Sequence, residues 1–196
     1  MTANLKTLST LALSALAGAM LTGAASAGTL QISPASSLAN VGDVLNFQVD
    51  GSGFAETVVG GGFNLSFDPT VLQFTGGSIA ASWEFLPSVG TVINQSATLS
   101  TLTDVSFSTF ANSISGNFAV ASLSFKAVGE GISALTFAPS ATFDFSDALG
   151  NQLNPSLLGG SVTVPVPEAS TLAMTLAGLL LMMGLRRASY QSAAKQ

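Results

Sequence analysis

Two carboxylates and an amide lie close together in the second half of the chain, at Asp144, Asp147 and Asn151. Their oxygen atoms are ligands that calcium prefers, and a nearby glycine, Gly150, would let the chain wrap round an ion. The alternative is a metal-free turn in which these side chains accept backbone hydrogen bonds. We favour it, because the spacing differs from that of an EF-hand loop. The sequence therefore predicts at most a weak calcium site and no other cofactor.

Carboxylates are also the only groups that could perform catalysis here. The chain has no histidine and no cysteine, which excludes a Ser-His-Asp triad, a thiol nucleophile and an ordinary zinc or iron site. Glycoside hydrolysis needs only two carboxyl groups at a set separation, and Asp144 with Asp147, or Glu84 with Asp104, could supply them. So few ionisable groups offer few ways of tuning a pKa. We expect no enzyme and no catalytic residue, with a small glycosidase of envelope polysaccharide as the alternative.

The aromatic residues are predicted to fill the protein core and not to form a surface that stacks on a ligand. The single tryptophan, Trp83, could stack on a sugar ring, but it lies beside Phe85 and Leu86, and we predict that it is buried. All thirteen phenylalanines lie between Phe47 and Phe145, as expected for a core filled from two facing sheets.

The charge of the central region, Gly28–Val164, limits the partners it can bind. Its length suits one domain, and it carries nine carboxylates against one base, Lys126, for a formal charge of −8. Affinity for nucleic acid depends on lysine and arginine, so no nucleic-acid partner is expected. An anionic polysaccharide would be repelled unless a divalent cation bridged the two.

The stretch Gly60–Phe74 shows how this region folds. Phe63, Leu65 and Phe67 alternate with Asn64, Ser66 and Asp68, which predicts a strand with one buried and one solvent-facing side. Asp68-Pro69 favours a turn, and the apolar run that follows predicts a second strand.

Further runs of the same kind predict an all-β sandwich of about ten strands with no helix in this region. Between Asn117 and Ala127 the apolar side changes near Ala121, which indicates a β-bulge. The other predicted strands are Leu30–Ser33, Val44–Val49, Thr91–Asn94, Ala97–Leu102, Val105–Phe110, Ile132–Phe137, Ala141–Phe145 and Ser161–Val164.

These runs resemble those of the cohesin domain, a jelly-roll β-sandwich of about nine strands. The resemblance rests on Val41-Gly42-Asp43, Gly61-Gly62-Phe63-Asn64-Leu65-Ser66-Phe67-Asp68-Pro69, Val71-Leu72, Phe145-Ser146-Asp147, Gly150-Asn151 and Gly160-Ser161-Val162-Thr163-Val164. It implies a non-catalytic binding module, related to carbohydrate-binding modules. Cohesins that hold dockerins sit in multi-module scaffolds, whereas here we expect a single such domain between two sorting segments, and therefore no dockerin partner.

The first segment, Met1–Ala27, is typical of a secretory signal peptide. Lys6 precedes an apolar run, Leu8–Leu21, and small residues follow, with Ala25 and Ala27 in the pattern that signal peptidase recognises. The apolar run is shorter than the roughly 20 residues of a spanning helix. Cleavage is expected after Ala27.

The last segment, Pro165–Gln196, resembles the PEP-CTERM sorting signal of Gram-negative bacteria. The signal combines a motif, a short transmembrane helix at Leu172–Leu185 and a basic stop at Arg186 and Arg187. The motif comprises Val166, Pro167, Glu168, Ala169, Ser170 and Thr171. The resemblance implies recognition and cleavage by an exosortase, with export alongside exopolysaccharide; a plain membrane anchor is the alternative.

These observations predict an exported, non-enzymatic binding or matrix protein of the Gram-negative cell envelope. Its partners would be an exosortase, the secretion machinery and either exopolysaccharide or another envelope protein. Its helix would anchor it transiently in the inner membrane, and its sandwich would bind carbohydrate or protein.

Overall fold

A computed structural model describes residues 27–112, 114–166 and 173–183 of the chain. The signal-peptide prediction, most of the sorting motif and the two arginines lie outside these residues. The strands are β1 (Ala27–Ser33), β2 (Ser36–Leu38), β3 (Val44–Phe67), β4 (Leu72–Ile79), β5 (Thr91–Ser96), β6 (Leu99–Ser108), β7 (Ile114–Ala127), β8 (Gly131–Pro139), β9 (Ser146–Asp147), β10 (Ser156–Leu158) and β11 (Gly160–Val164).

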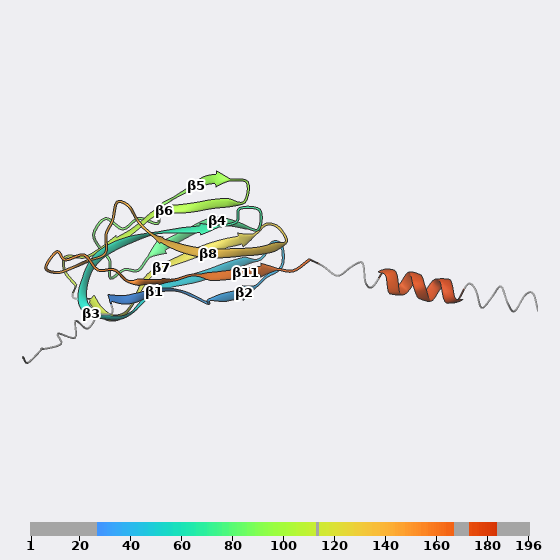
Figure 1. Cartoon of the computed structure of the whole chain (residues 1–196), viewed down its shortest axis with the longest axis horizontal. Coiled ribbons are helices and arrows are strands. Elements are labelled where there is room, and N and C mark those ends of the chain that lie inside the picture. The colour runs from blue at the N-terminus through green and yellow to red at the C-terminus, as the bar shows by residue number, and fades with distance from the viewer. Residues whose placement is uncertain (1–26, 113, 167–172, 184–196) are drawn as a thin grey trace, which may run out of the picture.

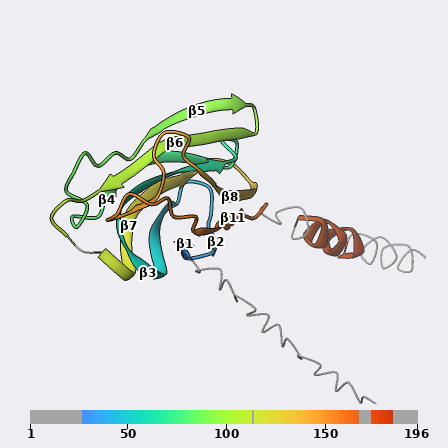
Figure 2. The same ribbon diagram turned by 60° about the vertical axis from the view of Figure 1, so that its left-hand side comes forward.

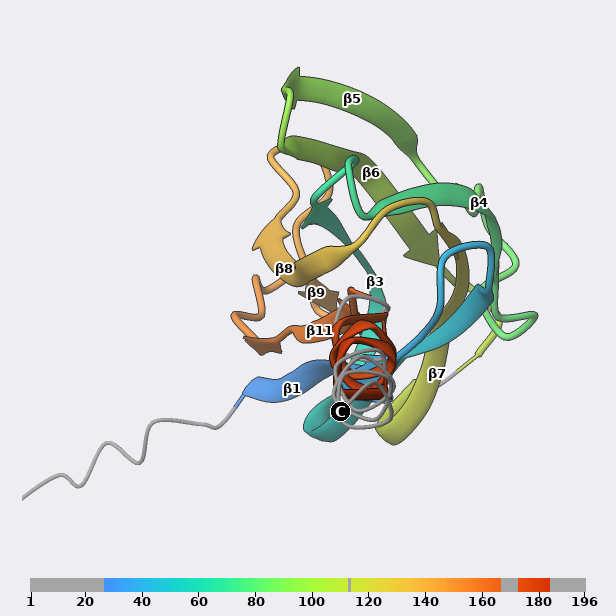
Figure 3. The same cartoon turned by 90° about the vertical axis from the view of Figure 1, so that its right-hand side faces the viewer.

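The strands form two layers that share the long strand β3 (Figure 1). In the first sheet, β1 and β7 flank the first half of β3, with β10 and β4 at the edges. In the second sheet, β6 and β8 flank its last residues, followed by β5 on one side and β11 and β2 on the other. Seen end-on in Figure 3, the strands surround a common interior. The predicted all-β sandwich is confirmed.

The predicted strand, turn and strand of the glycine-rich stretch are confirmed. Phe63, Leu65 and Phe67 are buried in the core, as their alternation with polar residues predicts. Asp68 forms the turn: its Oδ1 accepts the N–H of Thr70 at 2.8 Å, and β4 follows.

Three details of the strand prediction differ from the structure. Val44–Val49 and Gly60–Phe67 belong to one continuous strand, β3, and the two runs on either side of residue 104 belong to β6, interrupted by a bulge. The strand predicted at Ala141–Phe145 is wrong: this segment is a loop, because the Ser140 hydroxyl accepts the N–H groups of Thr142 and Phe143 and turns the chain.

Asn64 and Ser66 were expected to face solvent, but both are half-buried and hydrogen-bonded to neighbouring strands. Asn64 and Ser66 contact β8 and β6, the strands on either side of β3. Periodicity within one strand does not reveal contacts with its neighbours.

The core confirms the predictions for the bulge and for the tryptophan. Val49 pairs with Ala121 and Asp50 with Ala119, so Val120 is the extra residue in β7. Trp83 is buried, its ring packs edge-on against Phe107 with centroids 4.7 Å apart, and its Nε1–H donates to the Ala119 carbonyl at 2.8 Å. Every buried core residue of the described chain lies between Leu30 and Val164. The sandwich therefore contains its own core.

Residues 173–183 form a helix whose side chains are exposed. Over the described ranges, no helix is both long enough and apolar enough to cross a bilayer.

Candidate binding face

Asp147 caps a tight turn. Its Oδ1 accepts the N–H groups of Leu149 at 2.9 Å and Asn151 at 2.7 Å, and its Oδ2 accepts the Asn151 side-chain amide at 2.8 Å. These bonds, led by the Asn151 amide, hold the pKa of the Asp147 carboxyl below its ordinary value. N–H donors point at both oxygens, which is the geometry of a side-chain-capped turn. Calcium binding here stays a prediction, and this geometry favours the structural role.

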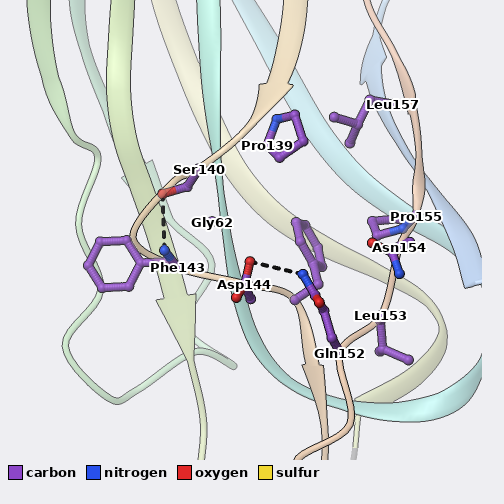
Figure 4. A pocket seen from close by; sticks show the side chains of 11 residues that line it. Gly62, Pro139, Ser140, Phe143, Asp144, Gln152, Leu153, Asn154, Pro155 and Leu157 are labelled. Carbon is purple, nitrogen blue, oxygen red and sulfur yellow. Dashed lines mark hydrogen bonds between the residues drawn. The ribbon is translucent and has the colours of Figure 1, made fainter.

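Asp144 belongs to a different surface. It is exposed, and its Oδ1 accepts the side-chain amide of Gln152 at 3.1 Å, as Figure 4 shows. It lines a small hollow of about 80 Å³ beside Gly62 and Phe143, to which Asp147 does not contribute. Within the described residues, no group of three or more acidic side chains is arranged to hold a metal.

Glu84 connects two loops. Its Oε1 accepts the Thr109 hydroxyl and the N–H groups of Phe110 and Ala111 at 2.9–3.0 Å, and its Oε2 accepts the Asn112 amide. These donors, the Ala111 N–H foremost, lower the pKa of the Glu84 carboxyl to about 2. A general acid requires a raised pKa, so this carboxylate is suited to holding loops together and not to protonating a glycosidic oxygen.

Asp104 occupies the bulge of β6, with φ at 57°. Its N–H donates to the Asn64 side-chain oxygen at 2.8 Å, and its carboxylate accepts the Ser140 hydroxyl at 2.9 Å. Asn64 also donates its amide to the Pro139 carbonyl, so this side chain connects the bulge to β8. Asp104 and Glu84 share no interaction, and the proposed acid and base pairs gain no support from the arrangement.

The outer side of the second sheet carries side chains from several strands, and we call it the outer face. Strand register places one row across four strands, formed by Ile93, Thr101, Ser66 and Thr136, in which Thr101 is buried and Ser66 is half-buried. The face continues over β8, β11 and β2 with Ala134, Ile132, Thr163 and Leu38. Of its aliphatic side chains, Leu38 is 74% exposed, Ile132 69% and Ile93 50%.

The outer face differs from the opposite side of the molecule in charge. None of the residues named above for it is ionisable, and the carboxylate of Asp104 in the bulge is already bonded to Ser140. The outer side of the first sheet instead carries Asp50, whose carboxyl pKa is raised by burial, and Lys126, the only base among the described residues. The outer face is therefore an uncharged, partly aliphatic surface on an acidic domain.

A groove of about 400 Å³ lies at one end of the outer face, and we call it the end groove. Gly60, Gly61, Ser106 and Ser108 form its floor on β3 and β6. One wall is formed by Phe85, Leu86 and Phe110, from the loops before β5 and after β6. The opposite wall is formed by Phe143 and Asp144, from the loop after β8. The third glycine, Gly62, lets the second wall approach, because a Cβ there would lie 2.7 Å from that of Phe143.

The aromatic walls correct the expectation that phenylalanines form only core. Phe85, Phe110 and Phe143 are exposed, and the rings of Phe85 and Phe110 pack with centroids 4.4 Å apart. Composition alone assigned them to the core. The signal that could have separated them is position, since each lies in a segment without strand alternation or at the end of a strand.

No family model and no curated protein matches the chain. Among solved structures, the fold is similar to the cohesin CaCohA2 from Clostridium acetobutylicum, at 20% identity and a TM-score of 0.54, over 70% of this chain and 91% of that one. It is also similar to the sixth cohesin of scaffoldin B from Acetivibrio cellulolyticus, solved with the Cel5 dockerin, at 16% identity and a TM-score of 0.54, over 70% and 98% of the two chains. The chain thus has a cohesin-like fold.

Proposed function

We propose that this chain is an exported, non-enzymatic module that binds a partner protein through its outer face. The observation that carries the proposal is the uncharged patch of exposed aliphatic side chains on the second sheet. Leu38 and Ile132 flank Thr163 in one cross-strand row, so they form a local apolar patch, and such patches on soluble proteins mark interaction sites. Charged residues are also depleted at the centre of protein interfaces.

The chemistry of the outer face favours a protein over a glycan. Its exposed side chains are leucine, isoleucine, alanine and threonine, which pack against other side chains. Its most central hydroxyls are already committed, since Ser66 and Thr101 bond each other at 2.9 Å. The cohesins of similar fold include structures solved with dockerins, which supports a protein partner.

The two ends of the chain supply the proposed location. The signal peptide would export the domain, and the PEP-CTERM-like tail would anchor it transiently in the inner membrane until an exosortase releases it beside exopolysaccharide. Mass spectrometry of the exported protein should find an N-terminus at Gly28 and no residues after Glu168. An intact tail with Arg186 and Arg187 on the mature protein would instead indicate a plain anchor.

The binding proposal is tested with two matched substitutions. Ile132→Lys places a charge on the outer face, and Val44→Lys places the same charge at an exposed strand position on the opposite sheet. A partner captured from the envelope fraction by Gly28–Val164 should lose about tenfold affinity for Ile132→Lys, because a buried unpaired charge costs more than 1 kcal/mol at an interface. Its affinity for Val44→Lys should stay within about twofold. Equal affinity for both variants, or binding only to a glycan array, would refute the proposal.

A further inference from the structure

The end groove lies on the same side of the second sheet as the outer face, farther along β3 and β6. Gly60 pairs with Ser108 and Gly62 with Ser106, at outward positions of β3 and β6, the strands that also carry Ser66 and Thr101. Figure 2 shows β5 and β6 as a hairpin at one edge of this sheet, and the groove lies farther along β6, beyond the residues that pair with β5. A partner lying along the outer face would therefore reach the groove.

The walls of the end groove are held open with their apolar side chains exposed. Phe110 is 80% exposed, yet its loop is held in place by Glu84, which binds the N–H groups of Phe110 and Ala111. The loop of Phe85, on the same wall, is held to β6, where the Phe85 N–H donates to the Ser108 carbonyl and the Ser108 hydroxyl donates to that of Phe85. These contacts fix the aromatic pair before any partner arrives.

Leu86, on the same wall of the end groove, has a strained backbone. Its φ is 44°, in the left-handed region that favours glycine, and its side chain is 75% exposed. Apart from Asp104, it is the only non-glycine residue of the described chain with a positive φ. Little packing compensates for this strain, and strain of this kind concentrates at functional sites.

The charge around the groove selects the partner's chemistry. Asp144 stands on the groove wall, and only its Oδ1 is bonded, to Gln152. The one base of the described domain, Lys126, lies on the other sheet, so no protein cation faces this wall. A basic residue would complement Asp144 and the surrounding acidic domain.

From this geometry we infer that the end groove takes an apolar anchor side chain of the partner protein, with a lysine or arginine next to it that pairs with Asp144. The inference rests on the proposed function. It adds that the partner is anchored in the end groove, and that the partner's anchoring segment has an apolar side chain next to a lysine or arginine. Aromatic and leucine anchors in preformed pockets carry much of the affinity of such interfaces.

The probe is a displayed library of short random peptides, selected on the Gly28–Val164 domain. Enriched peptides should share an aromatic residue or leucine beside lysine or arginine. They should bind the Phe110→Ala variant about tenfold more weakly, and Asp144→Asn should remove the preference for a basic over an acidic neighbour. Leu86→Gly should melt at the same or a higher temperature than the parent while binding more weakly, since it relieves strain and removes a wall.

The outcomes separate the two proposals. Peptides that lose affinity for Ile132→Lys but bind Phe110→Ala and Leu86→Gly as well as the parent would overturn the groove and leave the outer face standing. Enriched peptides without a basic residue, or with unchanged affinity for Asp144→Asn, would overturn the charge pairing. Failure to enrich any peptide, or enrichment insensitive to every variant, would refute both. Competition by a neutral oligosaccharide such as maltotriose would assign the groove to sugar instead.

Discussion

Asn64 is the half-buried side chain whose removal tests the architecture most directly. It accepts the Asp104 N–H at 2.8 Å and donates to the Pro139 carbonyl at 3.2 Å, so it connects β3 to β6 and β8. Asn64→Ala removes two hydrogen bonds worth roughly 1 kcal/mol each. It also leaves the positive φ of Asp104 without its tether. We expect a loss of about 2 kcal/mol, a large part of the roughly 5–15 kcal/mol available to one domain.

Urea denaturation of Gly28–Val164 measures this loss. The control is Gln48→Ala, an exposed position on the same strand, which should change the free energy of unfolding by less than about 0.5 kcal/mol. If Asn64→Ala and Gln48→Ala unfold at the same urea concentration as the parent, the bridge contributes nothing and the bulge of β6 is held by other contacts.

Three further predictions concern the core, acid stability and calcium. Phe67→Ala should cost about 3–5 kcal/mol, because the ring is buried against Phe125 with centroids 5.2 Å apart; a melting temperature equal to the parent's would contradict this. The Glu84 carboxyl has a pKa of about 2 against an ordinary 4.5, so its stabilisation is complete above pH 4.5 and is lost as the pH falls toward 2. Glu84→Gln should therefore show a flatter decline of melting temperature over that range, and an unchanged pH profile would argue against the loop contacts. Calcium should leave the melting temperature unchanged because N–H donors occupy both Asp147 oxygens; a rise that disappears in Asp147→Asn would establish a metal site.

The fold was largely accessible from sequence pattern because strand periodicity reports burial directly. The alternation of Phe63, Leu65 and Phe67 identified the buried side of β3, and the change of parity near Ala121 located a bulge. Such patterns arise from the geometry of one strand. They do not reveal which strands are continuous, so the runs before and after the Gly51–Gly53 region were separated although they belong to β3.

The candidate site was less accessible, because its parts come from distant segments. Phe85, Phe110 and Phe143 become neighbours of the end groove only through the pairing of β3 with β6 and the loop after β8. The acids identified from spacing, Asp144 and Asp147, proved to serve different surfaces. Spacing along a loop does not determine which way successive side chains point once hydrogen bonds bend it.

The sequence by itself determined the class of this protein: an acidic all-β domain without histidine or cysteine, so without the usual catalytic or metal-binding groups. These properties depend on composition and local periodicity, which folding does not change. Only the tertiary structure decided which apolar residues stay exposed. Leu38, Ile132 and Ile93 lie on one side of the second sheet because strand register relates their positions across six strands, and register is set by long-range hydrogen bonds.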